Sequence, residues 1–119
     1  MSKFKCIIVD DEPIAIRVIK SHLSNFPEFE LVAECNNAID ALKVLRNQTV
    51  DLLFLDIEMP VLTGLDMLKS LMHVPQVIFT TAHRNYAVDA FEVKALDYLL
   101  KPIALDRFIQ SINRFLDLQ

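Results

Sequence analysis

The feature that most constrains this fold is a regular alternation of short apolar runs with segments of helical period. Five runs are too short for helices, and several are almost continuously apolar, which is typical of strands buried on both faces of a parallel sheet. We expect strands at Phe4–Val9, Phe29–Cys35, Asp51–Leu55, Gln76–Thr80 and Asp97–Leu100.

Between these runs, apolar residues recur at the spacing of a helix that packs one side against a core. We expect the first two helices to follow Pro13 and the capping pair Asn36-Asn37, the third to open at Gly64, and the fourth to span Asn85–Phe91. The last helix has the clearest apolar stripe. Its inward-facing residues are expected to be Leu105, Phe108, Ile109, Ile112, Phe115 and Leu116, and those of the first three helices Ala15, Val18, Ile19, Leu23, Ala38, Ala41, Leu42, Leu45, Leu65, Leu68 and Leu71.

Strands that alternate with helices predict an α/β fold, because each parallel return needs a right-handed crossover. For a single domain with five strands and five helices over residues 1–119, we expect a flavodoxin-like, doubly wound sheet in the order 2-1-3-4-5. In that order strands 1 and 3 are neighbours, and sites form at the carboxyl ends of the strands.

Composition excludes several function classes. The 12 lysines and arginines are scattered and the net charge is -4, which argues against nucleic-acid binding by this chain. The single glycine, Gly64, excludes P-loop and dinucleotide motifs. No apolar run approaches the roughly 20 residues of a membrane span, and the N-terminus lacks a signal peptide, so we expect a cytoplasmic chain with no membrane contact. We expect Cys6 and Cys35 to be reduced, buried thiols.

Charged residues gather where three predicted strands end. Asp10 and Asp11 follow the first strand, Asp56 follows the third, and Lys101 follows the fifth. Three converging carboxylates repel one another unless a cation compensates them. Oxygen ligands that leave room for water suit Mg²⁺. The pattern therefore predicts a magnesium site, although each residue alone could be an ordinary helix-start, turn or strand-end residue.

The remaining polar residues at this edge favour phosphoryl transfer onto a carboxylate. Lys101 has a stem long enough to reach across the pocket, and Thr80-Thr81-Ala82 ends the fourth strand with hydroxyl and backbone donors. Mg²⁺ and the lysine would offset charge on the transferring group while Asp56 attacks in line.

These residues resemble the response regulator receiver domain over essentially the whole chain. The run Asp56-Ile-Glu-Met-Pro-Val-Leu-Thr-Gly64 matches that family's phosphoacceptor signature, and Asp10-Asp11, Thr81-Ala82 and Lys101-Pro102 follow in the family's order. The resemblance implies that Asp56 is phosphorylated, that Asp11, Asp56 and the Glu58 backbone carbonyl bind Mg²⁺, and that Asp10 binds it through water.

The resemblance also assigns residues that respond to the phosphoryl group. It implies that Lys101 pairs with the group, that Thr81 and the Ala82 backbone contact it, and that Tyr98 turns inward as Thr81 moves. The Lys101–Pro102 peptide bond would be cis. His83 and Glu58 occupy positions that tune dephosphorylation in the family, whereas His22 and His73 lack metal-ligand spacing.

The chain is most similar to receivers of the LytR/AlgR group, which precede a LytTR-type DNA-binding domain absent from this sequence. We therefore expect a non-enzymatic signalling domain that accepts phosphate from a histidine kinase. It would switch a surface of the fourth helix, fifth strand and last helix for homodimerisation and transcriptional output. Two alternatives remain: a stand-alone protein-binding receiver module, and a Mg²⁺-dependent aspartyl-phosphate phosphohydrolase.

Overall fold

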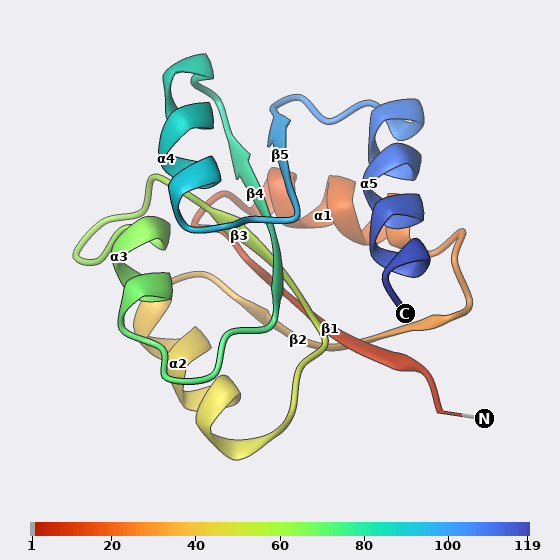
Figure 1. Ribbon diagram of the computed structural model, residues 1–119, viewed down its shortest axis with the longest axis horizontal. Coiled ribbons are helices and arrows are strands. Elements are labelled where there is room, and N and C mark those ends of the chain that lie inside the picture. Colours follow the sequence, from red (N-terminus) through yellow and green to blue (C-terminus); the bar gives the residue numbers. More distant parts are fainter. Residues whose placement is uncertain (1) are drawn as a thin grey trace.

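A five-stranded parallel sheet forms the centre of the molecule in the computed structural model (Figure 1). The structure describes residues 2–119 apart from the side chains of Val88 and Phe91, so Met1 of the predicted domain lies outside the described residues. The strands are β1 (Phe4–Val9), β2 (Phe29–Cys35), β3 (Leu52–Asp56), β4 (Gln76–Thr81) and β5 (Asp97–Leu100). Their order is β2-β1-β3-β4-β5, which confirms the predicted flavodoxin-like topology.

The helices follow the strands in regular alternation. They are α1 (Pro13–Leu23), α2 (Ala38–Asn47), α3 (Gly64–Lys69), α4 (Ala87–Glu92) and α5 (Leu105–Asp117), with a 3-10 turn, η1, at Arg84–Tyr86. Asn37 caps α2 by accepting a hydrogen bond from the Asp40 backbone N–H at 2.8 Å, as predicted.

Three predicted elements, two strands and one helix, differ from the structure at their ends or in their division. β3 begins at Leu52 and includes Asp56, and β4 extends to Thr81. The predicted helix at Asn85–Phe91 is divided into η1 and α4. Ends of this kind depend on backbone pairing and on helix type, to which a pattern of apolar residues is insensitive.

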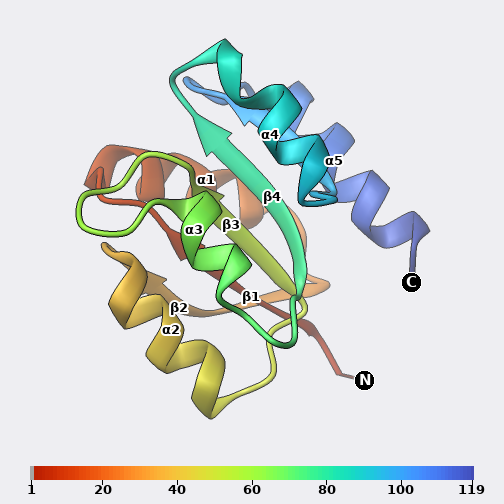
Figure 2. The ribbon, with the colours of Figure 1, turned by 60° about the vertical axis from the view of Figure 1, so that its left-hand side comes forward.

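Helices cover both faces of the sheet (Figures 1 and 2). α1 and α5 lie on one face, whereas α2, α3 and α4 lie on the other. On the first face, Phe108 of α5 stacks on Phe54 of β3 with ring centroids 5.5 Å apart. All described residues of β3 are buried, as expected for the middle strand of a sheet that is covered on both sides.

One part of the predicted core of α5 is wrong. Leu105 and Ile109 are 41% and 37% exposed, although Phe108, Ile112 and Phe115 are fully buried. At about 100° per residue, Leu105 and Ile109 lie on the flank of the stripe that faces the sheet. Ser111, on the opposite flank, is buried instead.

Both cysteines are free and buried, and burial raises the pKa of the Cys6 thiol to about 12. Among the described residues, no helix has the length and apolar character needed to cross a bilayer.

Candidate functional site

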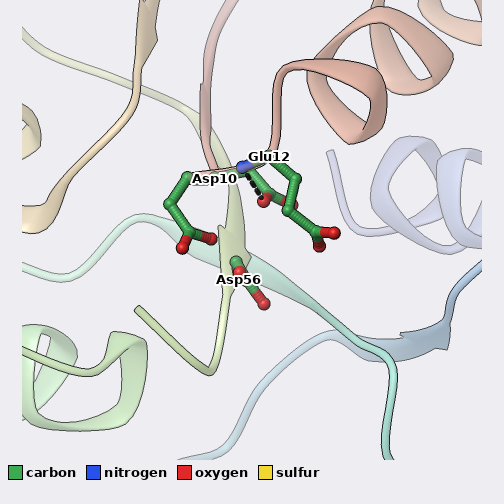
Figure 3. A group of neighbouring side chains, drawn as sticks. Asp10, Glu12 and Asp56 are labelled. Atoms are coloured by element: carbon green, nitrogen blue, oxygen red, sulfur yellow. Dashed lines mark hydrogen bonds between the residues drawn. The ribbon is translucent and has the colours of Figure 1, made fainter. Parts of the chain in front are cut away.

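Four carboxylates meet at the carboxyl edge of the sheet. Asp10, Asp11 and Glu12 lie between β1 and α1, and Asp56 ends β3; one oxygen from each lies within 4.8 Å of the others. Figure 3 shows the carboxyl groups of Asp10, Glu12 and Asp56 converging at this edge. The sequence-predicted convergence of Asp10, Asp11 and Asp56 is therefore present in the structure.

The pairing of β1 with β3 produces this convergence. Val9 is in register with Leu55, so Asp10 and Asp56 follow at adjacent positions on neighbouring strands. Asp10 is 0% and Asp56 3% exposed, whereas Asp11 and Glu12 are exposed. Asp10 Oδ1 accepts a hydrogen bond from the Glu12 backbone N–H at 2.9 Å, which holds the chain close to the cluster as α1 begins.

Lys101 brings the complementary charge from the end of β5. Its Nζ lies 2.9 Å from Asp10 Oδ2, 2.6 Å from Glu12 Oε1 and 3.6 Å from Asp56 Oδ2. Burial alone would lower the pKa of Lys101, but these carboxylates raise it to about 12. The ammonium group therefore stays charged, and the peptide bond that follows it, Lys101–Pro102, is cis.

The environment of Asp56 disfavours its ionised form. Burial and the nearby Asp10 carboxylate raise the pKa of Asp56 to about 8, although Lys101 and a hydrogen bond from the Glu58 backbone N–H oppose this rise. The repulsion between a buried carboxylate and its neighbouring carboxylates is reduced by a bound cation, or by covalent modification that changes the charge distribution of the group. The oxygen-only donor set and the size of the cluster fit a hard divalent ion.

Gly64 allows the loop after β3 to fold tightly against Asp56. Its backbone N–H donates to the Ile57 carbonyl at 2.8 Å. A Cβ at position 64 would lie 2.1 Å from the Asp56 carbonyl oxygen. The only glycine in the sequence is thus required by close backbone approach next to the site.

The end of β4 connects the site to β5 through a short hydrogen-bonded chain. Thr81 is fully buried, and its Oγ1 accepts a hydrogen bond from the His83 backbone N–H at 3.1 Å. The half-buried Tyr98 donates its hydroxyl hydrogen to the His83 carbonyl. His83 Nε2 in turn lies 3.2 Å from Glu58 Oε1, and Ala82 is exposed beside them.

Two interactions were not predicted from the sequence. Glu12 was not among the predicted site residues, yet it makes the shortest contact with Lys101. Asp97, buried at the start of β5, binds Arg107 of α5 through two hydrogen bonds of 2.9 and 2.8 Å and accepts a third from Ser111. Arg107 and Ser111 are four residues apart and so lie on the same side of α5. That spacing was the one sign in the sequence that they share a polar partner.

Comparisons with known proteins agree with this geometry. Residues 6–113 match the family model described as the response regulator receiver domain. The transcriptional regulatory protein BtsR of Salmonella typhimurium is 43% identical over 112 residues, which are 92% of this chain and 47% of that protein. The sensory transduction protein LytR of Staphylococcus haemolyticus is 40% identical over 113 residues, covering 92% of this chain and 44% of that protein. The chain thus spans about half the length of the curated relatives it matches.

A solved structure gives the same answer for the fold. The crystal structure of the response regulatory domain of protein mrkE from Klebsiella pneumoniae superposes with a TM-score of 0.88 at 34% identity, covering 97% of both chains. The sequence match, the strand order and the acidic edge of the sheet together show that this chain belongs to the response regulator receiver domain family of two-component systems.

Proposed function

We propose that this chain is a phosphorylation-activated switch in which Asp56 accepts a phosphoryl group from a histidine kinase. The observation that carries the proposal is the placement of Asp56, buried at the end of β3 with the charged Lys101 amine 3.6 Å away and three further carboxylates around it. In the transfer, an Asp56 carboxylate oxygen forms a bond to phosphorus as the donor's P–N bond breaks. The donor imidazole leaves with that electron pair and is protonated.

We propose Mg²⁺ as the cofactor. Asp11 and Asp56 would supply carboxylate oxygens, Asp10 would contribute through water, and Glu58 would contribute its backbone carbonyl. The fit is supported by four carboxylates within 4.8 Å and by the raised pKa of Asp56. When bound, the ion would offset negative charge on the carboxylates and on the incoming phosphoryl oxygens.

The chain's own residues would position and neutralise the phosphoryl group. We assign Lys101 to its oxygens because the ammonium is charged and faces Asp56. The Thr81 hydroxyl and the Ala82 backbone would provide further hydrogen bonds at the end of β4. These groups would promote transfer of the phosphoryl group to Asp56 and its later loss from Asp56. We therefore propose no catalytic turnover of an external substrate.

The response would reach the surface through Thr81 and Tyr98. Both are linked to the His83 backbone, so a shift of Thr81 toward the phosphoryl group would break its bond from the His83 N–H and release the contact that Tyr98 makes. The face of α4, β5 and α5 has a shallow pocket lined by Ala87 of α4, Tyr98 and Leu100 of β5, and Arg107 of α5. We propose this face as the one that pairs with a second copy or a partner after phosphorylation.

We further propose a transcriptional output in the cytoplasm through a DNA-binding domain outside this sequence. The support is that the chain spans about half the length of relatives named as transcriptional regulators. Two-hybrid or pull-down comparison of the phosphorylated and unphosphorylated chain would separate this switch from a binding module that ignores phosphorylation.

The proposed chemistry is tested by incubation with acetyl phosphate, followed by the intact mass of the protein. We expect one added phosphoryl group that requires Mg²⁺, is absent from Asp56→Asn, and forms at least about tenfold more slowly in Lys101→Ala. The matched control is Lys20→Ala, which removes an exposed lysine whose ion pair with Glu34 lies outside the site. An adduct that persists in Asp56→Asn, or sustained hydrolysis of small phosphate esters, would contradict the assignment.

A further inference from the structure

Thr80 has a buried hydroxyl that makes no hydrogen bond. Its side chain is 1% exposed, and Oγ1 has no partner within the described part of the chain. A buried polar atom of this kind destabilises the fold, and valine, which has the same shape, would avoid that cost. The hydroxyl therefore contributes nothing favourable to the resting structure, which points to a partner that forms in another state of the site.

The sheet places this hydroxyl next to the phosphoacceptor. Thr80 is in register with Asp56 on one neighbouring strand and with Leu99 on the other. Side chains alternate between the faces of a strand, and Ile78, two residues before Thr80, packs in the core under α1 and α5. Thr80 therefore points to the α1 and α5 face.

Lys101 reaches the acidic cluster across the end of the same strand. The order β1-β3-β4-β5 puts β4 between the start of the Lys101 side chain on β5 and its contacts on β1 and β3. Leu99, two residues before Lys101, belongs to the same core as Ile78. The Lys101 side chain thus passes the carboxyl end of β4 on its way to the acidic cluster, and Thr80 lies at that end of the strand.

The ammonium group is held toward β1 in the resting structure. It has three hydrogens and no acceptor, and its close contacts are Asp10 at 2.9 Å and Glu12 at 2.6 Å, whereas Asp56 is 3.6 Å away. Asp10 and Glu12 also belong to the carboxylate cluster that would surround a divalent cation. A cation there would offset part of the negative charge of Asp10 and Glu12 and so weaken their attraction for Lys101.

We propose that Thr80 is a positioning residue for Lys101: its hydroxyl accepts one ammonium hydrogen when a divalent cation occupies the carboxylate cluster, and this holds Lys101 toward Asp56. The inference rests on the proposed phosphoacceptor function. It explains why a hydroxyl is retained where it has no partner in the resting state. It also assigns the two adjacent threonines different tasks, because Thr81 already accepts a hydrogen bond from the His83 N–H.

The test compares Thr80→Val, which removes the hydroxyl, with Thr80→Ser, which keeps it. In EDTA, urea unfolding should show Thr80→Val to be at least as stable as the parent chain. With Mg²⁺, its rate of phosphorylation by acetyl phosphate should fall by about tenfold, while Thr80→Ser stays within about threefold of the parent. A structural defect would lower stability and rate together, so opposite changes identify a positioning role.

Two further measurements connect the effect to Lys101. In a Lys101→Ala background, Thr80→Val should cause no additional loss of rate, because the partner of the hydroxyl is gone. The NMR signal of the Lys101 ammonium group should differ between the parent and Thr80→Val only after Mg²⁺ is added. This signal requires no phosphoryl donor, so it tests Thr80 even if the parent chain takes no phosphoryl group and the proposed function fails.

The inference is overturned if Thr80→Val phosphorylates at the parental rate, or if Thr80→Ser loses as much rate as Thr80→Val. It is also overturned if the losses of Thr80→Val and Lys101→Ala are independent, or if the Mg²⁺-bound ammonium signal is the same with and without the hydroxyl.

Discussion

Replacement of Asp56 by asparagine should stabilise the metal-free protein at neutral and alkaline pH. The pKa of Asp56 is raised from 3.8 to about 8 by burial and by Asp10. A carboxyl group with a higher pKa in the folded chain binds its proton more tightly there than in the unfolded chain. The unfolding free energy therefore falls as pH rises between these two values, and Asp56→Asn removes that loss.

The magnitude follows from the same pKa. Each pH unit between 3.8 and 7 lowers the unfolding free energy by about 1.4 kcal/mol. The raised pKa of Asp56 therefore destabilises the folded chain by at most about 4 kcal/mol at pH 7. Asparagine keeps the shape of the side chain, but its buried amide hydrogens also need partners. We therefore expect a net gain of about 1 to 3 kcal/mol.

The assay is urea unfolding in EDTA, followed by circular dichroism at acidic and alkaline pH. Asp56→Asn should gain stability over the parent as pH rises, whereas the control Asp117→Asn, at the exposed end of α5, should follow the parent within about 0.5 kcal/mol. A parallel pH dependence in Asp56→Asn and the parent, or an Asp56→Asn variant that is less stable at alkaline pH, would refute the reasoning.

Three further substitutions test the scaffold of the site. Gly64→Ala should destabilise the chain by about 2 kcal/mol or more and slow phosphorylation, because its Cβ would lie 2.1 Å from the Asp56 carbonyl oxygen; parental unfolding and labelling rates would contradict this. Asp97→Asn should lower the unfolding free energy by about 2 kcal/mol at pH 7. Because Arg107 and other partners lower the pKa of Asp97, the difference in stability from the parent should shrink as pH falls below 4. An unchanged urea midpoint at pH 7 would contradict this prediction. Phe108→Ala should cost about 3 to 5 kcal/mol in urea unfolding, since the ring is fully buried; a loss below about 1 kcal/mol would contradict its place in the core.

Much of the fold follows from patterns that the sequence presents directly. Continuous apolar runs such as Leu52–Leu55 can be satisfied only in a strand covered on both faces, and five such runs between helices allow few topologies. Once the strand order was fixed, Asp10, Asp56 and Lys101 had to meet, because each ends a strand at the same edge. The central part of the site was therefore predictable.

The interactions that were missed depend on which side chains meet far apart in the chain. Glu12 and Lys101 are separated by 89 residues, and nothing near Glu12 distinguishes an acid at a helix start from one that binds a distant lysine. The exposed Leu105 and Ile109 had the spacing of core residues, but the sheet contacts only the middle of the α5 stripe. The unpartnered Thr80 hydroxyl is a three-dimensional property, because it depends on every group packed around it.

The most direct test of the account identifies the carboxylate that carries the phosphoryl group. The chain would be phosphorylated with Mg²⁺, treated with borohydride to reduce the acyl phosphate to an alcohol, and digested for peptide mass mapping. We predict that residue 56 alone is converted to homoserine. Conversion at Asp10, Asp11 or Glu12 instead, or no conversion of a folded chain with either acetyl phosphate or a phosphohistidine donor, would contradict the assignment of Asp56 as the acceptor.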